Sequence, residues 1–399
     1  MRLALRALFA ALFSLAVVST SQAQLVASST VSDVAAQALG LTRAWATPVS
    51  VDVSRGRIVG LVLHKNILFA STSQGNVQAI DALTGATYWT VRVGQASYVT
   101  LPPGANDNFV VVTNGTTVYA LERRTGRLEF ERTTKGAPSA GPGLSDTHAY
   151  IPMYSGAIES YRLRDDTELD RSPTIFFSGG MPLAAPIIRG SRIYWTSKPG
   201  YIYADDSDSS ESRIRFSAAD KIYGQVALYK PALGEMKVLA GSHDGSVYAV
   251  NDPSGLLNWR YQSGAAVIQP PVVITDSVFV TNELGLFSRV DASNGVMRWQ
   301  APGVWRFVAA SPTRVYGMDD RGQLVALDAA TGGYMGSAFA GTTTIPFIND
   351  QNDRIYLVST NGMIQCLHER GLTSPVTHAA PAAPAAPIAP GAPAEAATQ

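Results

Sequence analysis

The sequence predicts an all-β protein that folds as an eight-bladed β-propeller of four-stranded antiparallel blades. A strand, a turn and a second strand recur eight times, and each unit carries one turn glycine: Gly75, Gly115, Gly156, Gly200, Gly245, Gly285, Gly322 and Gly362. Successive glycines lie 37 to 45 residues apart, the length of four short strands with their turns. The 35 glycines and the low share of charged residues, 16%, also favour many turns between apolar strands.

A second turn and an aromatic residue repeat behind the first turn. In five units the second turn begins with a polar residue and ends in glycine: 81–85, 122–126, 251–255, 291–295 and 328–332. The polar side chain is expected to cap its own turn, so these acids are assigned to structure rather than to catalysis. The aromatic residue is expected to dock between adjacent blades, and the docking residues are Trp45, Trp89, Phe130, Trp259 and Trp299. Gly336 interrupts this series in the seventh unit.

The two ends of the repeat region are expected to complete one blade together. The last unit, 352–368, stops after its third strand. Residues 41–49 contain Trp45 and resemble a fourth strand standing ahead of the first complete unit. Pairing of these segments would close the ring and remove the exposed edges that an open sheet must protect.

The segments outside the repeats predict export. Residues 1–23 combine an early positive charge, a short apolar run and small residues at the end, which is the pattern of a cleaved signal peptide. An uncleaved membrane anchor is the alternative, but the apolar run 7–18 is shorter than the roughly 20 residues of a spanning helix. The single cysteine, Cys366, does not follow the signal, so no lipid anchor is expected there. We therefore expect a periplasmic or secreted protein.

The domain organisation follows from these segments. Residues 24–39 are a lead-in, and residues 40–371 form the propeller. Residues 372–399 are rich in proline and alanine, a composition that cannot build a packed core, so we expect a disordered tail.

The repeat signature resembles that of a known class of propellers. Ala79, Asp81, Thr84, Gly85 and Trp89 match the tryptophan-docking repeat of the pyrroloquinoline-quinone (PQQ)-like propellers. Among these, the exported single-propeller members of the BamB family of outer-membrane protein assembly factors agree best in length, blade number and export. The resemblance implies a non-enzymatic scaffold rather than a true PQQ dehydrogenase, since those enzymes hold the quinone with a vicinal cysteine pair that this chain lacks. The missing lipid-bearing cysteine and the tail depart from the BamB pattern.

No motif in the sequence predicts catalysis, a cofactor or a metal. Lys plus Arg and Asp plus Glu both number 31, so no overall field attracts nucleic acid. The five histidines are scattered, without a pair at ligand spacing. Cys366 occupies a position filled by alanine in most units, so it is expected to be a small core residue.

Function is therefore expected on one rim of the disc. The starts of the innermost strands and the turn glycines share one face, and the loops of a propeller usually carry its function. We predict partner-binding residues there: Arg57, Tyr223, Gln225, Trp305, Arg306 and Phe307, with Gln95, Tyr98 and Gln269 on the same rim. Trp, Tyr and Arg recur as anchors of protein interfaces. A plug of side chains that fills the channel is the alternative.

The leading hypothesis is a monomeric, non-enzymatic binding scaffold of the bacterial cell envelope with a protein or envelope-polymer partner. An extracellular carbohydrate- or alcohol-acting enzyme is the second hypothesis, and it needs two acids that converge at the channel. An envelope sensor domain is the third.

Overall fold

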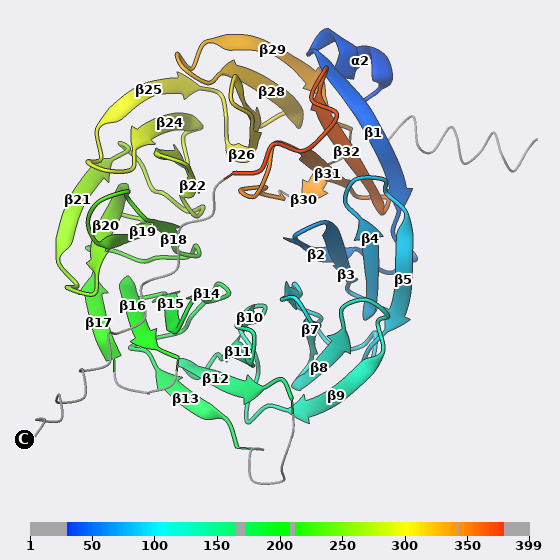
Figure 1. Ribbon diagram of the computed structural model, residues 1–399, viewed down its shortest axis with the longest axis vertical. Helices are drawn as coiled ribbons and strands as arrows, with labels where there is room; N and C mark the ends of the chain where they lie inside the picture. The colour runs from blue at the N-terminus through cyan, green and yellow to red at the C-terminus, as the bar shows by residue number, and fades with distance from the viewer. Residues whose placement is uncertain (1–29, 165–171, 208–211, 342, 346, 379–399) are drawn as a thin grey trace, which may run out of the picture.

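A computed structural model describes residues 30–164, 172–207, 212–341, 343–345 and 347–378. These residues form a ring of eight four-stranded antiparallel sheets around a central channel (Figure 1), so the predicted fold class is confirmed. The predicted signal peptide and residues 379–399 of the predicted tail lie outside the described residues. No helix in the described ranges is long and apolar enough to cross a membrane.

In the first four blades the chain runs from the innermost strand outwards. Blade 1 consists of β2 (Ile58–His64), β3 (Ile67–Thr72), β4 (Asn76–Asp81) and β5 (Thr87–Arg92). Blade 2 consists of β6 (Gly104–Ala105), β7 (Phe109–Asn114), β8 (Thr117–Glu122) and β9 (Leu128–Thr133). Blade 3 consists of β10 (Gly143–Leu144), β11 (His148–Pro152), β12 (Ala157–Arg162) and β13 (Thr174–Phe177). Blade 4 consists of β14 (Ile187–Arg189), β15 (Arg192–Ser197), β16 (Tyr201–Asp206) and β17 (Ser212–Ser217).

Blades 5 to 7 repeat this order, and blade 8 combines both ends of the chain. Blade 5 consists of β18 (Ala227–Tyr229), β19 (Met236–Gly241), β20 (Ser246–Asp252) and β21 (Leu257–Gln262). Blade 6 consists of β22 (Val272–Ile274), β23 (Ser277–Thr281), β24 (Leu286–Asp291) and β25 (Met297–Pro302). Blade 7 consists of β26 (Arg306–Ala310), β27 (Arg314–Met318), β28 (Gln323–Asp328) and β29 (Tyr334–Phe339). Blade 8 consists of β30 (Thr343–Ile345), β31 (Ile355–Ser359), β32 (Met363–Glu369) and β1 (Leu41–Pro48).

The position of a strand within its blade decides its burial. The second strands β3 and β7 are buried at every residue, because blades pack against both of their faces. The outermost strand β5 is largely exposed and buries mainly Trp89. The core therefore lies between adjacent blades rather than in the channel.

The ring is closed by the strand that was expected to close it. Strand β1 pairs antiparallel with β32, with Leu41 opposite Glu369 and Trp45 opposite Cys366. The lead-in adds two buried hydrogen bonds, since the backbone N–H and C=O of Val31 bond the side-chain amide of Gln365, each at 2.9 Å. Strand β1 is thus the fourth strand of blade 8.

A short helix in the lead-in, α2 (Asp33–Ala38), was not predicted from the sequence. The Ser32 side chain caps its N-terminus by accepting a hydrogen bond from the backbone N–H of Ala35 at 3.2 Å. The helix packs against β29, and a Cβ on Gly336 would lie 2.9 Å from the Leu39 side chain. Leu39 therefore covers the position where five of the seven other outer strands carry an aromatic residue.

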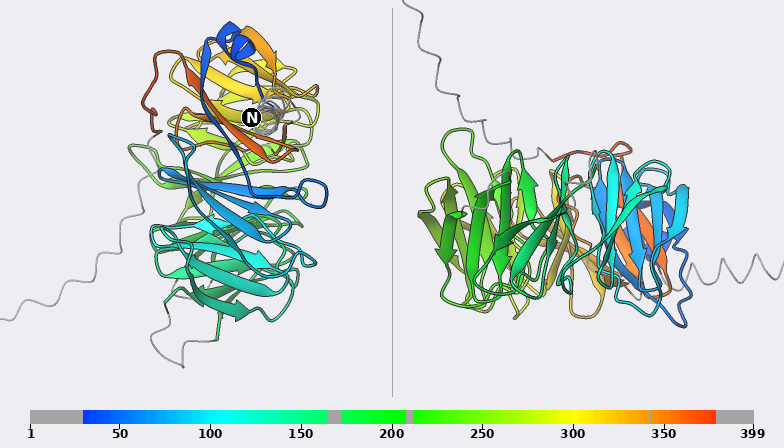
Figure 2. Two further views of the ribbon diagram at one scale, coloured as in Figure 1. Left: turned by 90° about the vertical axis from the view of Figure 1, so that its right-hand side faces the viewer. Right: turned by 90° about the horizontal axis from the view of Figure 1, so that it is seen from below.

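The disc has two faces that differ in their loops. Face A carries the turn glycines and the connections between blades, and face B carries the second turns. Residues 372–378 cross face B near the channel (Figures 1 and 2). The backbone N–H of Val376 bonds the buried carboxylate of Asp353 at 2.9 Å, and Arg354 bonds the carbonyl of Thr373 at 2.8 Å. The first seven residues of the predicted tail, 372–378, are thus hydrogen-bonded to the ring.

Candidate functional site

The tryptophans of the outer strands dock on the neighbouring blade. The indole Nε1 atoms of Trp45 and Trp89 donate to the carbonyls of Ala82 and Arg123, at 3.2 and 3.0 Å. Trp259 and Trp299 repeat this bond, with Ala292 and Ala329 as acceptors, at 3.0 Å each. The turn glycine is required here both for its left-handed backbone conformation and for its lack of a side chain, because a Cβ on Gly126 would lie 2.6 Å from the Trp89 ring. The tryptophans are therefore engaged in holding blades together.

The carboxylates of the second turns cap their own backbone. Asp81 accepts the N–H of Thr84 at 2.7 Å, and Asp328 accepts that of Thr331 at 2.8 Å. The hydroxyl and backbone hydrogen bonds from Thr331 hold the pKa of Asp328 below its usual range. These acids stay ionised and bonded within the turn, which is a structural role.

The predicted rim residues lie on three separate blades. Arg57 is exposed in blade 1, which stands opposite blade 5 in the ring. In blade 5, Gln225 is tied to the inner rim because its side-chain amide donates to the carbonyl of Ala185 at 2.8 Å. Tyr223 lies edge-on to the ring of His243, with the ring centroids 6.1 Å apart. Arg57 therefore cannot share one contact patch with Tyr223 and Gln225.

Trp305 is half-buried on face A and lies beside exposed apolar residues. A Cβ on Gly285 would lie 2.7 Å from the Trp305 indole, so this ring covers the glycine turn of blade 6. Leu284, the residue before that glycine, is 65% exposed. Gln269, which follows the exposed Ile268 in the chain, donates its side-chain amide to the Trp305 carbonyl at 2.9 Å. We call Ile268, Leu284, Trp305 and Arg306 the Trp305 patch.

Phe307 does not belong to this surface. Its side chain is only 2% exposed and stacks on Phe279 with ring centroids 5.3 Å apart. Strand β26 begins at Arg306, and successive residues of a strand point to opposite sides. Arg306 is therefore turned to solvent, while Phe307 is turned into the core between blades 6 and 7, and its predicted place on the rim is corrected.

Comparison with known proteins shows the family. A family model described as outer membrane protein assembly factor BamB matches residues 27–228 and 215–392, which is most of the chain. The chain belongs to the BamB family. A BamB from Moranella endobia (strain PCIT) is 28% identical over 273 residues, covering 59% of this chain and 69% of that protein.

Solved structures support the fold of this BamB family member. The crystal structure of BamB from Moraxella catarrhalis has a TM-score of 0.65 at 15% identity and covers 82% of this chain and 99% of its own. The crystal structure of the computationally designed Ika8 protein has a TM-score of 0.66 at 15% identity and covers 81% of this chain and 98% of its own. At this identity the likeness concerns the fold alone.

Two members of the patch, Ile268 and Leu284, were missed from the sequence. The residue before the turn glycine is polar or proline in the seven other units, and only Leu284 is apolar there. An exposed apolar residue at a turn position is a signal that could have been used. Ile268 carries no comparable signal, because the connections between blades do not follow the repeat.

The site of this BamB family member offers no cluster for a metal. Within the described ranges, no group of three or more His, Cys, Asp or Glu side chains is placed to hold an ion. Burial raises the pKa of the Cys366 thiol to about 12, so this thiol is not a ready nucleophile. What the Trp305 patch presents is an apolar contact surface beside one exposed arginine.

Proposed function

We propose that the protein is a non-enzymatic scaffold of the bacterial cell envelope that binds a protein partner through the Trp305 patch and supports outer-membrane protein assembly. The observation that carries the proposal is the exposure of neighbouring large apolar residues on a rigid rim, where burial against a partner is favourable. Each large apolar side chain that a partner covers contributes about 1.5 to 3 kcal/mol. Membership in the BamB family supports the assembly role, and the signal-like pattern of residues 1–23 supports an exported location.

The test combines gene deletion with matched surface variants. The gene is deleted, and β-barrel proteins in the outer membrane are quantified by mass spectrometry. The strain is then complemented with the wild type, with Leu284→Ser plus Trp305→Ala, or with Leu256→Ser as control. Leu256 is a good match because it is 67% exposed but lies in a second turn on face B.

We expect the Leu256→Ser protein to restore the outer-membrane proteins and the double variant to fail at equal cellular level. Full restoration by the double variant would remove the patch from the proposal. Unchanged outer-membrane content in the deletion strain would contradict the assembly role itself. A photo-crosslinking residue at position 305 then identifies the partner directly.

A further inference from the structure

The interface between blades 2 and 3 departs from the tryptophan-docking rule. Leu163 in blade 3 is equivalent to Ala82 in blade 1. The backbone N–H of Ala82 donates to the carbonyl of Asn66, and that of Leu163 donates to the carbonyl of Thr147 in the same inner turn of its own blade. In blade 1 the corresponding carbonyl accepts an indole N–H. Blade 2 presents Phe130 instead, whose ring is smaller and has no N–H to donate. The docking position is therefore incompletely filled.

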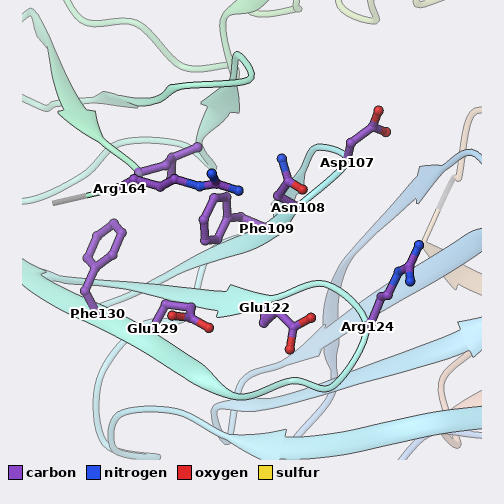
Figure 3. Close-up of a pocket in the computed structure, with 9 residues that line it drawn as sticks. Asp107, Asn108, Phe109, Glu122, Arg124, Glu129, Phe130 and Arg164 are labelled. Carbon is purple, nitrogen blue, oxygen red and sulfur yellow. The ribbon is translucent and has the colours of Figure 1, made fainter. Parts of the chain in front are cut away.

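A cavity of about 510 Å³ opens at this position on face B (Figure 3). Its apolar part is formed by Phe109 and Leu163, which are 6% and 1% exposed, and by the half-buried Phe130. This size falls within the range of roughly 300 to 1,000 Å³ that is usual for ligand pockets. The cavity accommodates at least one aromatic side chain.

The carboxylates around the cavity are already engaged. Asp107 bonds His64 at 2.8 Å and Lys65 at 2.6 Å, and Glu129 bonds Arg127 at 2.6 Å. Glu122 accepts a hydrogen bond from the hydroxyl of Thr125 in its own turn. Their negative charge is thus largely satisfied by neighbours on the same surface.

Two arginines of the lining remain available. Among the described residues, neither Arg124 nor Arg164 has a hydrogen-bonded or ion-paired carboxylate. Both are exposed, and the Arg164 guanidinium lies 6.0 Å from the centre of the Phe109 ring. An exposed guanidinium beside an apolar floor is well suited to bind a carboxylate whose neighbouring side chain enters the cavity.

We infer that this cavity is a second binding site, which takes an aromatic side chain from an acidic segment of a partner protein. Phe109, Phe130 and Leu163 would contact the ring, while Arg124 and Arg164 would pair with flanking Asp or Glu residues. The site is independent of the proposed function of the Trp305 patch, because it lies on the opposite face of the disc. A partner held here would leave the patch free.

The test uses a variant that fills the cavity with the residue found at equivalent positions. Phe130→Trp should dock as Trp89 does, so we expect an unchanged or higher Tm together with lost binding. Arg124→Glu plus Arg164→Glu tests the charge, and Arg260→Glu, at an exposed arginine on β21, is its control. The full exported chain is used in each case.

The probe is a blocked, fluorescently labelled peptide of sequence Asp-Glu-Phe-Glu-Asp, titrated by fluorescence anisotropy. Companion peptides replace Phe by Ala, or all four acids by Lys. Of the three peptides, we expect only the acidic Phe peptide to bind the wild type, with a submillimolar Kd. Its affinity should be at least tenfold weaker for both the Phe130→Trp and the Arg124→Glu plus Arg164→Glu variants. Its affinity for Arg260→Glu should be unchanged. Equal binding of the lysine peptide, equal binding by Phe130→Trp, or no binding to the wild type at millimolar peptide would each overturn the inference.

Discussion

At the scale of single residues, adjacent blades are joined by one repeated contact and by its substitutes. Trp89 illustrates the repeat: it is 9% exposed, and its indole bonds the next blade. Blade 4 has no such tryptophan, and the Arg192 side chain instead reaches Asp252 of blade 5, with Nε–Oδ2 at 3.2 Å. Tyr194 bonds the same carboxylate at 2.6 Å. The ring thus tolerates different chemistry at different blade interfaces.

We expect Trp89→Phe to lower the free energy of unfolding by about 1 to 3 kcal/mol, because the Arg123 carbonyl loses its donor and the smaller ring leaves a void. Urea unfolding followed by circular dichroism measures the change. Tyr334→Phe is the control: Tyr334 is 67% exposed on another outer strand, and its substitution should stay within about 0.5 kcal/mol. A tryptophan variant as stable as the wild type would show that docking contributes little.

The buried ion pair allows a sharper test. Asp252→Ala should destabilise the protein by about 3 to 5 kcal/mol, because the Arg192 guanidinium, with an 8% exposed side chain, loses its buried partner and keeps only the less buried Asp206. The double variant Arg192→Met plus Asp252→Leu removes both charges, so its free energy of unfolding should fall by less than that of Asp252→Ala. The prediction fails if the double variant, measured in the same urea titration, loses as much stability as Asp252→Ala or more.

At the scale of elements, the N-terminal segment completes two interfaces at once. Strand β1 supplies the outer edge of blade 8, and Leu39, which is 6% exposed, fills the place left by Gly336 on β29. Helix α2 has only six residues, too few to be stable alone, so its order comes from packing and from the Ser32 cap. The segment therefore belongs to the ring and is not merely a leader to it.

Deleting residues 24–49 should lower the Tm of the whole ring in one transition, because blade 8 is left with three strands and β32 with an open edge. Ser32→Ala, which removes only the helix cap, should cost about 1 kcal/mol. Scanning calorimetry of the two variants beside the full chain distinguishes these effects. A truncated protein that melts like the full chain would contradict the closure argument.

At the scale of the whole molecule, acid stability should depend on the repeated turn carboxylates. Burial opposes the ionisation of Asp291, but hydrogen bonds from Ser293 and Arg298 outweigh it and lower the pKa of this group to about 2. The side-chain bonds from His64 and Lys65 lower the pKa of Asp107 to about 2. Since both folded values lie below the ordinary value near 3.8, the stabilisation is complete above about pH 4 and is lost as the pH falls towards 2.

We therefore expect the Tm to fall between about pH 4 and pH 2, and Asp291→Asn to flatten that fall while lowering the Tm at neutral pH. Thermal melts across this range measure both effects. Asp320→Asn is a suitable control because Asp320 is exposed in the turn between β27 and β28 and has no hydrogen bond or ion pair among the described residues. A pH profile identical for wild type and Asp291→Asn would refute the role of the turn.

The repeat spacing was enough to predict blade number and ring closure, because each structural residue recurs at a fixed place. The functional surface was harder to predict, because it lies in connections that do not repeat. The binding role of Trp305 and Arg306 stays a prediction, whereas Phe307 is buried, as the alternation of side chains along β26 would have indicated. The contact between Leu39 and Gly336 could not be predicted from the sequence of either segment alone, because the two residues meet only when the ring has closed.

The order of synthesis delays the pairing of the closing strand. Strand β1 is among the first segments to be synthesised, and its partner β32 ends only at Glu369. At about 5 to 20 residues per second, roughly 15 to 65 s separate the two. Throughout that interval Trp45 and the unpaired edge of β1 have no blade to join.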